Sequence, residues 1–387
     1  MVTMILTGIL TVNKNKKRET FTVSLFIQGM QYMKYFLITI LIFFTVSVAF
    51  CEKSMAELNP EFESRIANAE KVYVQETPCF SLFLFSDVHS DAVEYDRMMS
   101  FYTHYQKYFD DALCLGDIIE NFTYDSNFFV RDLRTKKVLF TMGNHDVFNG
   151  SWEKTVSMGQ CYNRYYAPVI NSWNAVYTPG KTYFYKDYSA KKIRLIVLDS
   201  MLKNEEMENQ LKWFEETLSE ANSKNLSVIA GTHFPMLTDG KQIKCCFSVQ
   251  DRQIGATKKI PENDNYEKNG FMPAKTEDFQ KAVQHFTNAG GYFVCWLGGH
   301  IHYDSVEYDQ KYNQLSINID ASGRYMCSVI SPADRTDGTK NQDLADAFIV
   351  DTDNKLIKLI RIGCDSDRFM AHRDIMCIRY TDFKVFN

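Results

Sequence analysis

Five short clusters in the chain combine Asp, His, Asn and Glu, the side-chain types that bind borderline divalent metal ions. They contain five of the eight histidines. In chain order the clusters are Asp87-Val88-His89, Asp117-Ile118-Ile119-Glu120, Asn144-His145-Asp146, Thr232-His233 and His300-Ile301-His302. Side chains two positions apart in an extended chain point the same way, so the Asp-x-His and His-x-His pairs are expected to reach a common metal site. Such ligand sets favour zinc, manganese or iron over calcium.

Each cluster directly follows a short apolar segment that is typical of a strand buried on both faces. These five segments are Phe80–Phe85, Ala112–Leu115, Val138–Met142, Leu226–Ala230 and Tyr292–Leu297. Helical patterns separate several of them: Asp91–Phe109, Asn209–Ala221 and Thr276–Asn288, the last with Thr276 as its N-cap. Alternating strands and helices predict an α/β fold, and such sheets bind ligands beyond the carboxyl ends of their strands. The five clusters are therefore expected to meet in one crevice.

Other segments complete the predicted organisation. Residues 182–188 and 192–198 predict a hairpin, and residues 347–362 predict a second, closing hairpin. Residues 236–275 form a long polar insertion which, with the 147–181 loop, is a candidate for the rim of the substrate site. Cys114 and Cys295 lie inside apolar runs and are expected to be buried, inert thiols. With no C-x-x-C in the chain, a zinc ribbon is not indicated, and disulfide pairing stays open.

Taken together, the five clusters resemble the calcineurin-like metallophosphoesterase superfamily. Its pattern is D-x-H, G-D-x-x-[DE], G-N-H-[DE], a Gly/Thr-His and G-H-x-H, and the resemblance covers about residues 79–325. It implies an αββα sandwich, with two mixed β-sheets packed face to face and flanked by helices. The expected organisation is then an N-terminal extension (1–51), a lead-in (52–78), a catalytic domain (79–325) and a C-terminal β extension with a hairpin (326–387).

The resemblance also implies roles for individual residues, carried over by position. Two divalent ions, of manganese, iron or zinc, would be bound. The first ion would be held by Asp87, His89, Asp117 and His302, and the second by Asp117, Asn144, His233 and His300. Asp117 would then bridge the ions. His145 would be an unligated general acid, and Glu120 would be the acid that orients its ring.

Two departures narrow the expected activity. Asn121 stands where protein Ser/Thr phosphatases carry an Arg that clamps phosphate, and Glu120 stands where purple acid phosphatases carry a metal-binding Tyr. Neither of these classes is expected. The predicted reaction is hydrolysis of a phosphate monoester on a small molecule or lipid. Two alternatives stay open. One is a phosphodiesterase acting on nucleotides or phospholipid head groups. The other is a non-catalytic surface binding protein, and the presence of all seven expected metal ligands argues against it.

Charge and the N-terminus indicate partners and location. Residues 52–387 carry nine more acidic than basic side chains, and an acidic body repels a phosphate backbone, so nucleic acid is not an expected partner. Tyr35–Phe50 is an uncharged run after Lys34, with small residues at Ser47 and Ala49, which favours a cleaved signal peptide and an exported protein. An uncleaved membrane anchor over residues 35–50 is the alternative, and Met33 is a second candidate start.

Overall fold

The computed structural model describes residues 54–70, 77–89, 92–123, 127–151, 154–236, 275–302, 305–323, 336, 338–363 and 376–386. The predicted signal segment and residues 237–274 of the predicted polar insertion lie outside these ranges. Within them, no helix has both the length and the apolar character needed to cross a membrane.

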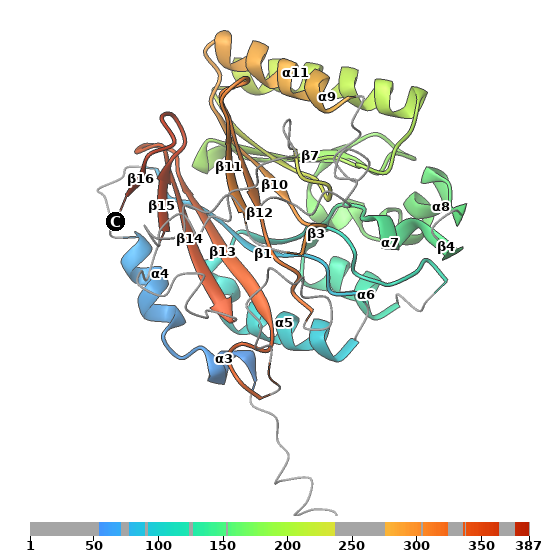
Figure 1. Ribbon diagram of the computed structural model, residues 1–387, viewed down its shortest axis with the longest axis vertical. Coiled ribbons are helices and arrows are strands. Elements are labelled where there is room, and N and C mark those ends of the chain that lie inside the picture. The colour runs from blue at the N-terminus through green and yellow to red at the C-terminus, as the bar shows by residue number, and fades with distance from the viewer. Residues whose placement is uncertain are drawn as a thin grey trace, which may run out of the picture. The chain divides into compact units, whose positions relative to one another are not determined.

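Two mixed seven-stranded sheets form the core (Figure 1). The first has the order β16 (Val385–Phe386), β15 (Met376–Arg379), β14 (Leu356–Gly363), β13 (Leu344–Asp351), β1 (Phe80–Phe85), β2 (Asp111–Cys114) and β3 (Val138–Phe140). The second has the order β11 (Ser305–Asp309), β12 (Gln314–Asn318), β10 (Phe293–Gly298), β9 (Ser227–Gly231), β8 (Ile193–Val197), β7 (Phe184–Tyr188) and β6 (Val176–Tyr177). Strands β1 to β3 run parallel, as do β8, β9, β10 and β12, so the carboxyl ends within each set share one edge of their sheet.

The sheets pack face to face because their strands are apolar on both sides. All six residues of β1 are buried, and so are all six of β10. Between the sheets, the Phe80 ring lies 4.6 Å from that of Tyr188, and the Thr141 hydroxyl donates a 2.5 Å hydrogen bond to the Leu198 carbonyl. Each large apolar side chain buried in this way contributes about 1.5–3 kcal/mol.

Helices cover the outer faces of both sheets. On the first sheet, α5 (Ala92–Tyr105) packs through Tyr102, whose ring lies 5.5 Å from that of Phe83. On the second, α9 (Glu205–Ser223) places Phe214 5.8 Å from the Trp296 ring, and α11 (Thr276–Asn288) packs beside it. The four layers confirm the predicted α/β sandwich.

Shorter elements complete the described chain. The helices are α3 (Met55–Leu58), α4 (Phe62–Glu70), α6 (Asn127–Thr135), α7 (Asn144–Val147) and α8 (Met158–Cys161). A π-helix covers Tyr162–Tyr166, and 3₁₀ turns cover Gln106–Tyr108, Ile170–Trp173 and Ser189–Lys191. A two-stranded sheet joins β4 (Phe148–Ser151) to β5 (Lys154–Thr155). The helices α3 and α4 fall in the predicted lead-in, for which no helix is expected from sequence.

Both predicted hairpins are present, β7 with β8 and β13 with β14. The second does more than close the chain, because β13 pairs antiparallel with β1 along Phe80↔Val350 to Leu84↔Asp346. Strands β13 to β16 therefore supply four of the seven strands of the first sheet. Cys114 and Cys295 are buried, as predicted. The predicted N-cap of α11 is wrong: Lys275 is the N-cap, and Thr276 is already the first helical residue.

Candidate metal centre

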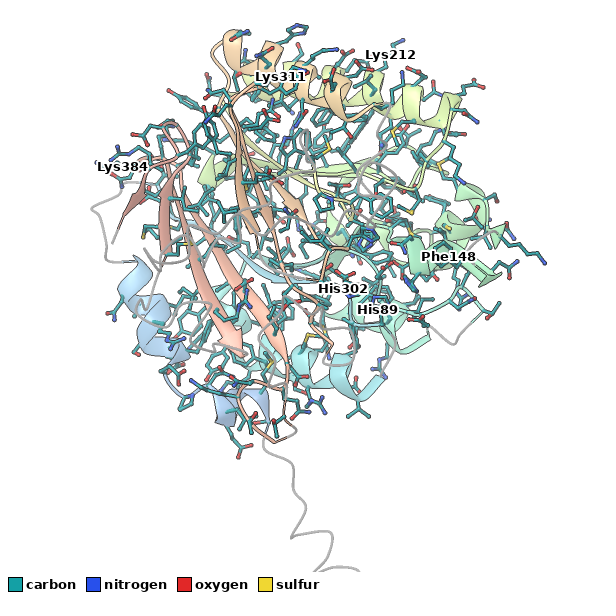
Figure 2. The ribbon with its side chains drawn as sticks, viewed as in Figure 1. His89, Phe148, Lys212, His302, Lys311 and Lys384 are labelled. Carbon is teal, nitrogen blue, oxygen red and sulfur yellow. The ribbon has the colours of Figure 1, made fainter. Side chains whose placement is uncertain are left out.

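The residues predicted to bind metal come together at the carboxyl ends of five parallel strands. Asp87 and His89 follow β1, Asp117 follows β2, Asn144 follows β3, His233 follows β9, and His300 and His302 follow β10. Figure 2 shows His89 and His302 next to one another, although more than 200 residues separate them in the chain. The predicted crevice is thus a real convergence of side chains from both sheets.

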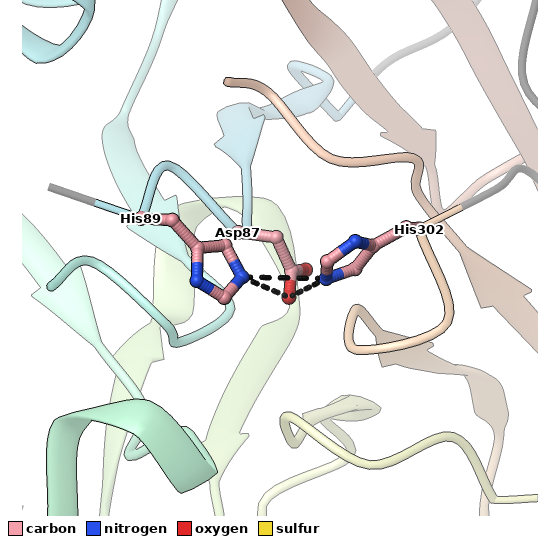
Figure 3. Close-up of side chains that lie close together, drawn as sticks. All are labelled: Asp87, His89 and His302. Carbon is pink, nitrogen blue, oxygen red and sulfur yellow. Dashed lines mark hydrogen bonds and ion pairs between the residues drawn. The ribbon is translucent and has the colours of Figure 1, made fainter. Parts of the chain in front are cut away.

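The first group of donor atoms belongs to Asp87, His89 and His302 (Figure 3). His302 Nε2 lies 3.2 Å from Asp87 Oδ1, and His89 Nε2 lies 3.8 Å from the same oxygen. The two Nε2 atoms are 3.3 Å apart. Two imidazole nitrogens and a carboxylate oxygen facing one point form a ligand set for a borderline divalent cation.

The second group belongs to Asp117, His233 and His300, with Asn144 beside them. His233 Nε2 lies 3.1 Å from Asp117 Oδ2 and 2.9 Å from Asn144 Oδ1. Asp117 Oδ2 also lies 3.8 Å from His89 Nε2 of the first group. Asp117 therefore stands between the two groups, where a carboxylate ligand shared by two ions would have to stand.

The oxygen of Asp87 that faces the first group supports metal binding there. Asp87 Oδ2 accepts hydrogen bonds from the Ser86 hydroxyl at 2.5 Å and from the His300 backbone N–H at 2.9 Å. Asp87 Oδ1 is buried, and among the described residues no group donates a hydrogen bond to it. A buried carboxylate oxygen without a donor is costly unless a cation supplies the missing interaction.

Backbone strain is concentrated on the same ligands. Five of the seven have left-handed φ values: Asp87 (52°), His89 (51°), Asp117 (52°), His300 (66°) and His302 (49°). This conformation costs on the order of 1–3 kcal/mol for a residue other than glycine and is characteristic of functional sites. The prediction that Asp87 and His89, and likewise His300 and His302, lie in extended chain is wrong. The side chains of Asp87 and His89 converge because the backbone turns sharply after β1, whereas His300 and His302 belong to different donor groups.

Hydrogen bonds on the far side of two imidazole rings determine which nitrogen faces the site. His233 Nδ1 lies 2.7 Å from the Leu115 carbonyl, which can only accept, so Nδ1 carries a proton and Nε2 is the nitrogen that faces Asp117. Likewise, His89 Nδ1 lies 2.8 Å from Glu120 Oε2 and donates its proton to that carboxylate oxygen. Such outer contacts orient histidine ligands and raise their basicity.

The pKa values of the histidines in the site depend on burial, which lowers them, and on neighbouring charged groups. Burial would lower the pKa of His89, but the nearby carboxylate of Asp87 and the hydrogen bond to Glu120 raise it to about 10. The pKa of His233 rises to about 9, since the charge of Asp117 outweighs burial. Burial and the positive charge of His233 instead lower the pKa of His300 to about 3. Cations would thus replace protons at His89 and His233, as in metal sites generally.

His145 lies beside the first group, without being part of the two ligand sets. Its ring centroid is 4.4 Å from that of His89. Its Nδ1 lies 3.0 Å from the Glu120 carbonyl oxygen and 3.4 Å from Glu120 Oε1, so Nδ1 carries a proton that the Glu120 carbonyl accepts. Glu120 contacts His145, but its carboxylate is closer to His89. The residue therefore contacts both rings.

Asp146 is a contributor to the site for which sequence reasoning assigned no role. Its buried carboxylate accepts backbone N–H groups from two strand ends: Asp117 at 2.8 Å, Ile118 at 3.1 Å, Ile119 at 3.3 Å and Gly143 at 2.9 Å. It ties the loop after β2 to the loop after β3. In the sequence, the acidic last position of the G-N-H-[DE] pattern marks Asp146 as a candidate, but the backbone groups that it contacts are known only from the fold.

The fold and the site together define a protein of the two-sheet α/β class that gathers histidines and carboxylates into a candidate metal centre at the carboxyl edge of its strands. A family model described as calcineurin-like phosphoesterase matches residues 80–304, more than half of the chain. The chain therefore belongs to the calcineurin-like phosphoesterase family and is a metal-dependent hydrolase of phosphate esters.

Other comparisons give weak likenesses. No curated protein matches the chain. Among solved structures, a dimetal phosphatase from Danio rerio is similar at 11% identity and a TM-score of 0.47, over 78% of this chain and 99% of that one. A predicted phosphoesterase from Streptococcus pneumoniae aligns at 11% identity and a TM-score of 0.32, over 74% and 91%. The GAP50 anchor in the inner membrane complex of Plasmodium aligns at 10% identity and 0.44, over 76% and 87%.

Proposed function

We propose that this protein is an exported phosphomonoesterase that uses two divalent ions. The observation that carries the proposal is the position of Asp117, whose Oδ2 is 3.8 Å from His89 Nε2 and 3.1 Å from His233 Nε2. One carboxylate oxygen in reach of both donor groups is the arrangement that a two-metal site requires. One ion is assigned to Asp87, His89, Asp117 and His302, and the other to Asp117, Asn144, His233 and His300. Manganese, iron or zinc suits these ligands.

The chemistry divides between the ions and the chain. Bound divalent ions polarise a phosphoryl oxygen and make water nucleophilic at neutral pH. We assign His145 as the chain's own acid: the Glu120 carbonyl accepts its Nδ1–H and orients the ring, and Nε2 is the nitrogen that would protonate the departing oxygen. Asp117 Oδ1 accepts the His145 backbone N–H at 2.8 Å, which fixes the acid relative to the ligand between the two groups. Glu120 positions both rings.

Replacement of His145 tests this division of roles. A general acid contributes about 10²–10⁴-fold, and an alkoxide leaving group needs the proton far more than nitrophenolate does. We expect His145→Gln to keep its metal content and to lose much more rate on an alkyl phosphate than on nitrophenyl phosphate. His285→Gln, an exposed histidine on α11, is the matched control and should change neither rate.

Three outcomes would count against the proposal. Loss of metal in His145→Gln would make the histidine a ligand, and equal loss on both esters would make it a phosphate-positioning group. Faster turnover of bis-nitrophenyl phosphate than of nitrophenyl phosphate would indicate a phosphodiesterase acting on nucleotides or phospholipid head groups. Metal binding without turnover of any ester would indicate a non-catalytic binding protein.

The substrate and location are part of the same proposal. The acidic balance of residues 52–387 argues against nucleic acid and leaves a phosphorylated small molecule or lipid as substrate. Export is supported by the uncharged Tyr35–Phe50 run and the small residues Ser47 and Ala49. N-terminal sequencing of the mature protein should find a start near Phe50. An intact Met1 on soluble cytoplasmic material would refute export, and an intact run in membrane fractions would indicate an anchor.

A further inference from the structure

The π-helix over Tyr162–Tyr166 contacts both loops that carry the proposed acid and the residue that orients it. Its characteristic hydrogen bond runs from the Ala167 N–H to the Tyr162 carbonyl, five residues earlier, at 2.8 Å. Single turns of π-helix are rare and are frequently found at functional sites. This one contains no proposed metal ligand, so a role in the reaction must be exerted through its contacts with the two loops.

Arg164 of the π-helix holds the loop after β2. Its Nη1 donates a hydrogen bond to the Phe122 carbonyl, and its guanidinium carbon lies 4.4 Å from the centroid of the Phe122 ring. Phe122 is two residues after Glu120, and its own N–H donates to the Phe148 carbonyl at 2.8 Å. The Phe148 ring in turn lies 5.2 Å from the His145 ring. Arg164 is therefore the start of a short series of contacts that ends on the acid.

Tyr165, the next residue of the π-helix, holds the loop after β3. Its hydroxyl donates a 3.3 Å hydrogen bond to the carbonyl of Asp146, which directly follows His145 in the chain. The side chain of Tyr165 is fully buried, and its ring lies 5.9 Å from that of Phe122 in the other loop. Because a buried carbonyl is destabilised when it loses a donor, this hydrogen bond favours one position of the loop. Consecutive residues of the π-helix thus connect the two loops.

We propose that Arg164 and Tyr165 are positioning residues for the general acid, and that they act through the pair formed by His145 and Glu120 and not through the metal ions. The inference rests on the proposed phosphomonoesterase function. An acid is effective only when its donor is aligned with the leaving oxygen, and a misplacement of about 1 Å can cost on the order of 10²-fold in rate. Loosening either loop should therefore impair protonation of the leaving group and leave the two ligand sets intact.

Two neighbouring tyrosines of the π-helix provide a matched comparison. Tyr165→Phe deletes the hydroxyl that holds the Asp146 carbonyl. Tyr166→Phe deletes an equally buried hydroxyl, which donates at 3.1 Å to the carbonyl of Phe140, the last residue of β3. Both variants should unfold at a lower temperature than the wild type, because each loses one buried hydrogen bond. Only Tyr165→Phe should lose kcat/KM, by about 10-fold on methyl phosphate and far less on nitrophenyl phosphate, since methoxide needs the acid's proton far more.

Variants of Arg164 test the second contact. Arg164→Met removes the donor and the charge, and should show the same selective loss on methyl phosphate with an unchanged KM for nitrophenyl phosphate. Arg164→Lys keeps a cation and a donor beside Phe122 and should recover part of the lost rate. Elemental analysis should find the metal content of the wild type in each variant. In a His145→Gln background, neither Arg164→Met nor Tyr165→Phe should lower the rate further, because the acid through which they act is absent.

The outcomes separate the inference from the function on which it rests. An equal loss on the two esters, a loss of metal, or a raised KM for both esters in Arg164→Met would overturn the positioning role and leave the phosphomonoesterase standing. So would an unchanged ratio of the two rates in Tyr165→Phe, which deletes a single oxygen and decides the matter should Arg164→Met fold poorly. If the metal-loaded wild type hydrolyses neither ester, the proposed function itself is wrong, and the inference falls with it.

Discussion

Replacing Gly143 by Ala is a one-carbon test of how tightly the loop after β3 holds Asp117. The φ of Gly143 is −101°, which alanine adopts freely, so backbone strain does not enter. A Cβ built on Gly143 overlaps Asp117 Oδ1 and the Asp117 backbone nitrogen, and it lies only 2.8 Å from Asp117 Cγ. To restore an ordinary van der Waals distance between the new Cβ and Asp117, the carboxylate must move by on the order of 1 Å.

The magnitude follows from that displacement. A shift of about 1 Å in a catalytic group costs on the order of 10²-fold in rate, and overpacking a buried site costs about 1–3 kcal/mol of stability. Gly143→Ala should therefore fold, unfold at a lower temperature, bind metal more weakly and lose about 10²-fold in kcat/KM on nitrophenyl phosphate. Gly159→Ala is the matched control, because a Cβ at that position meets no atom of the described residues within 4 Å. Wild-type metal content and rate in Gly143→Ala would refute the placement of Asp117 between the two donor groups.

Further predictions concern the ligands, a buried carboxyl and a buried ion pair. Asp117→Asn should weaken metal binding at both sites, so that the purified variant retains less than one equivalent of metal, whereas His302→Ala should chiefly weaken one site. Elemental analysis of the two purified variants distinguishes these results. Burial raises the pKa of Asp199 to about 6, so ionisation destabilises the fold as pH rises. Asp199→Asn should therefore gain roughly 2 kcal/mol relative to wild type between pH 4 and pH 7 in denaturant titrations, and a constant difference would contradict this. Asp346→Ala should cost about 3–5 kcal/mol, because it removes the carboxylate that pairs with the buried Arg361 at 2.7 Å; an unchanged unfolding midpoint would contradict this.

Local sequence patterns predict the strands and ligands well because both depend on neighbouring residues. An apolar run of strand length followed by Asp or His indicates a buried strand with a polar end, and β1 and β10 match their predicted ranges to within one residue. Parallel strands then bring the ends within each sheet to one edge, so the convergence of Asp87 with Asp117 follows from topology, whereas that of His300 also depends on how the two sheets pack.

What could not be predicted depends on contacts between distant segments. The pairing of β13 with β1 joins residues about 270 apart in sequence, as in Ser81↔Ile349, and neither strand's local pattern specifies its partner. The four N–H groups bound by Asp146 come from two loops that meet only in the fold. The left-handed φ at Asp87 is likewise imposed by surrounding packing, because aspartate alone disfavours it.

The most direct test of two-metal catalysis is a titration of chelator-treated protein with manganese, zinc or ferrous ion while hydrolysis of nitrophenyl phosphate is followed. The position of Asp117 between the two donor groups predicts no activity without metal and a rate that rises until two equivalents are bound. Full activity in the metal-free protein, or a maximum reached at one equivalent, would contradict it.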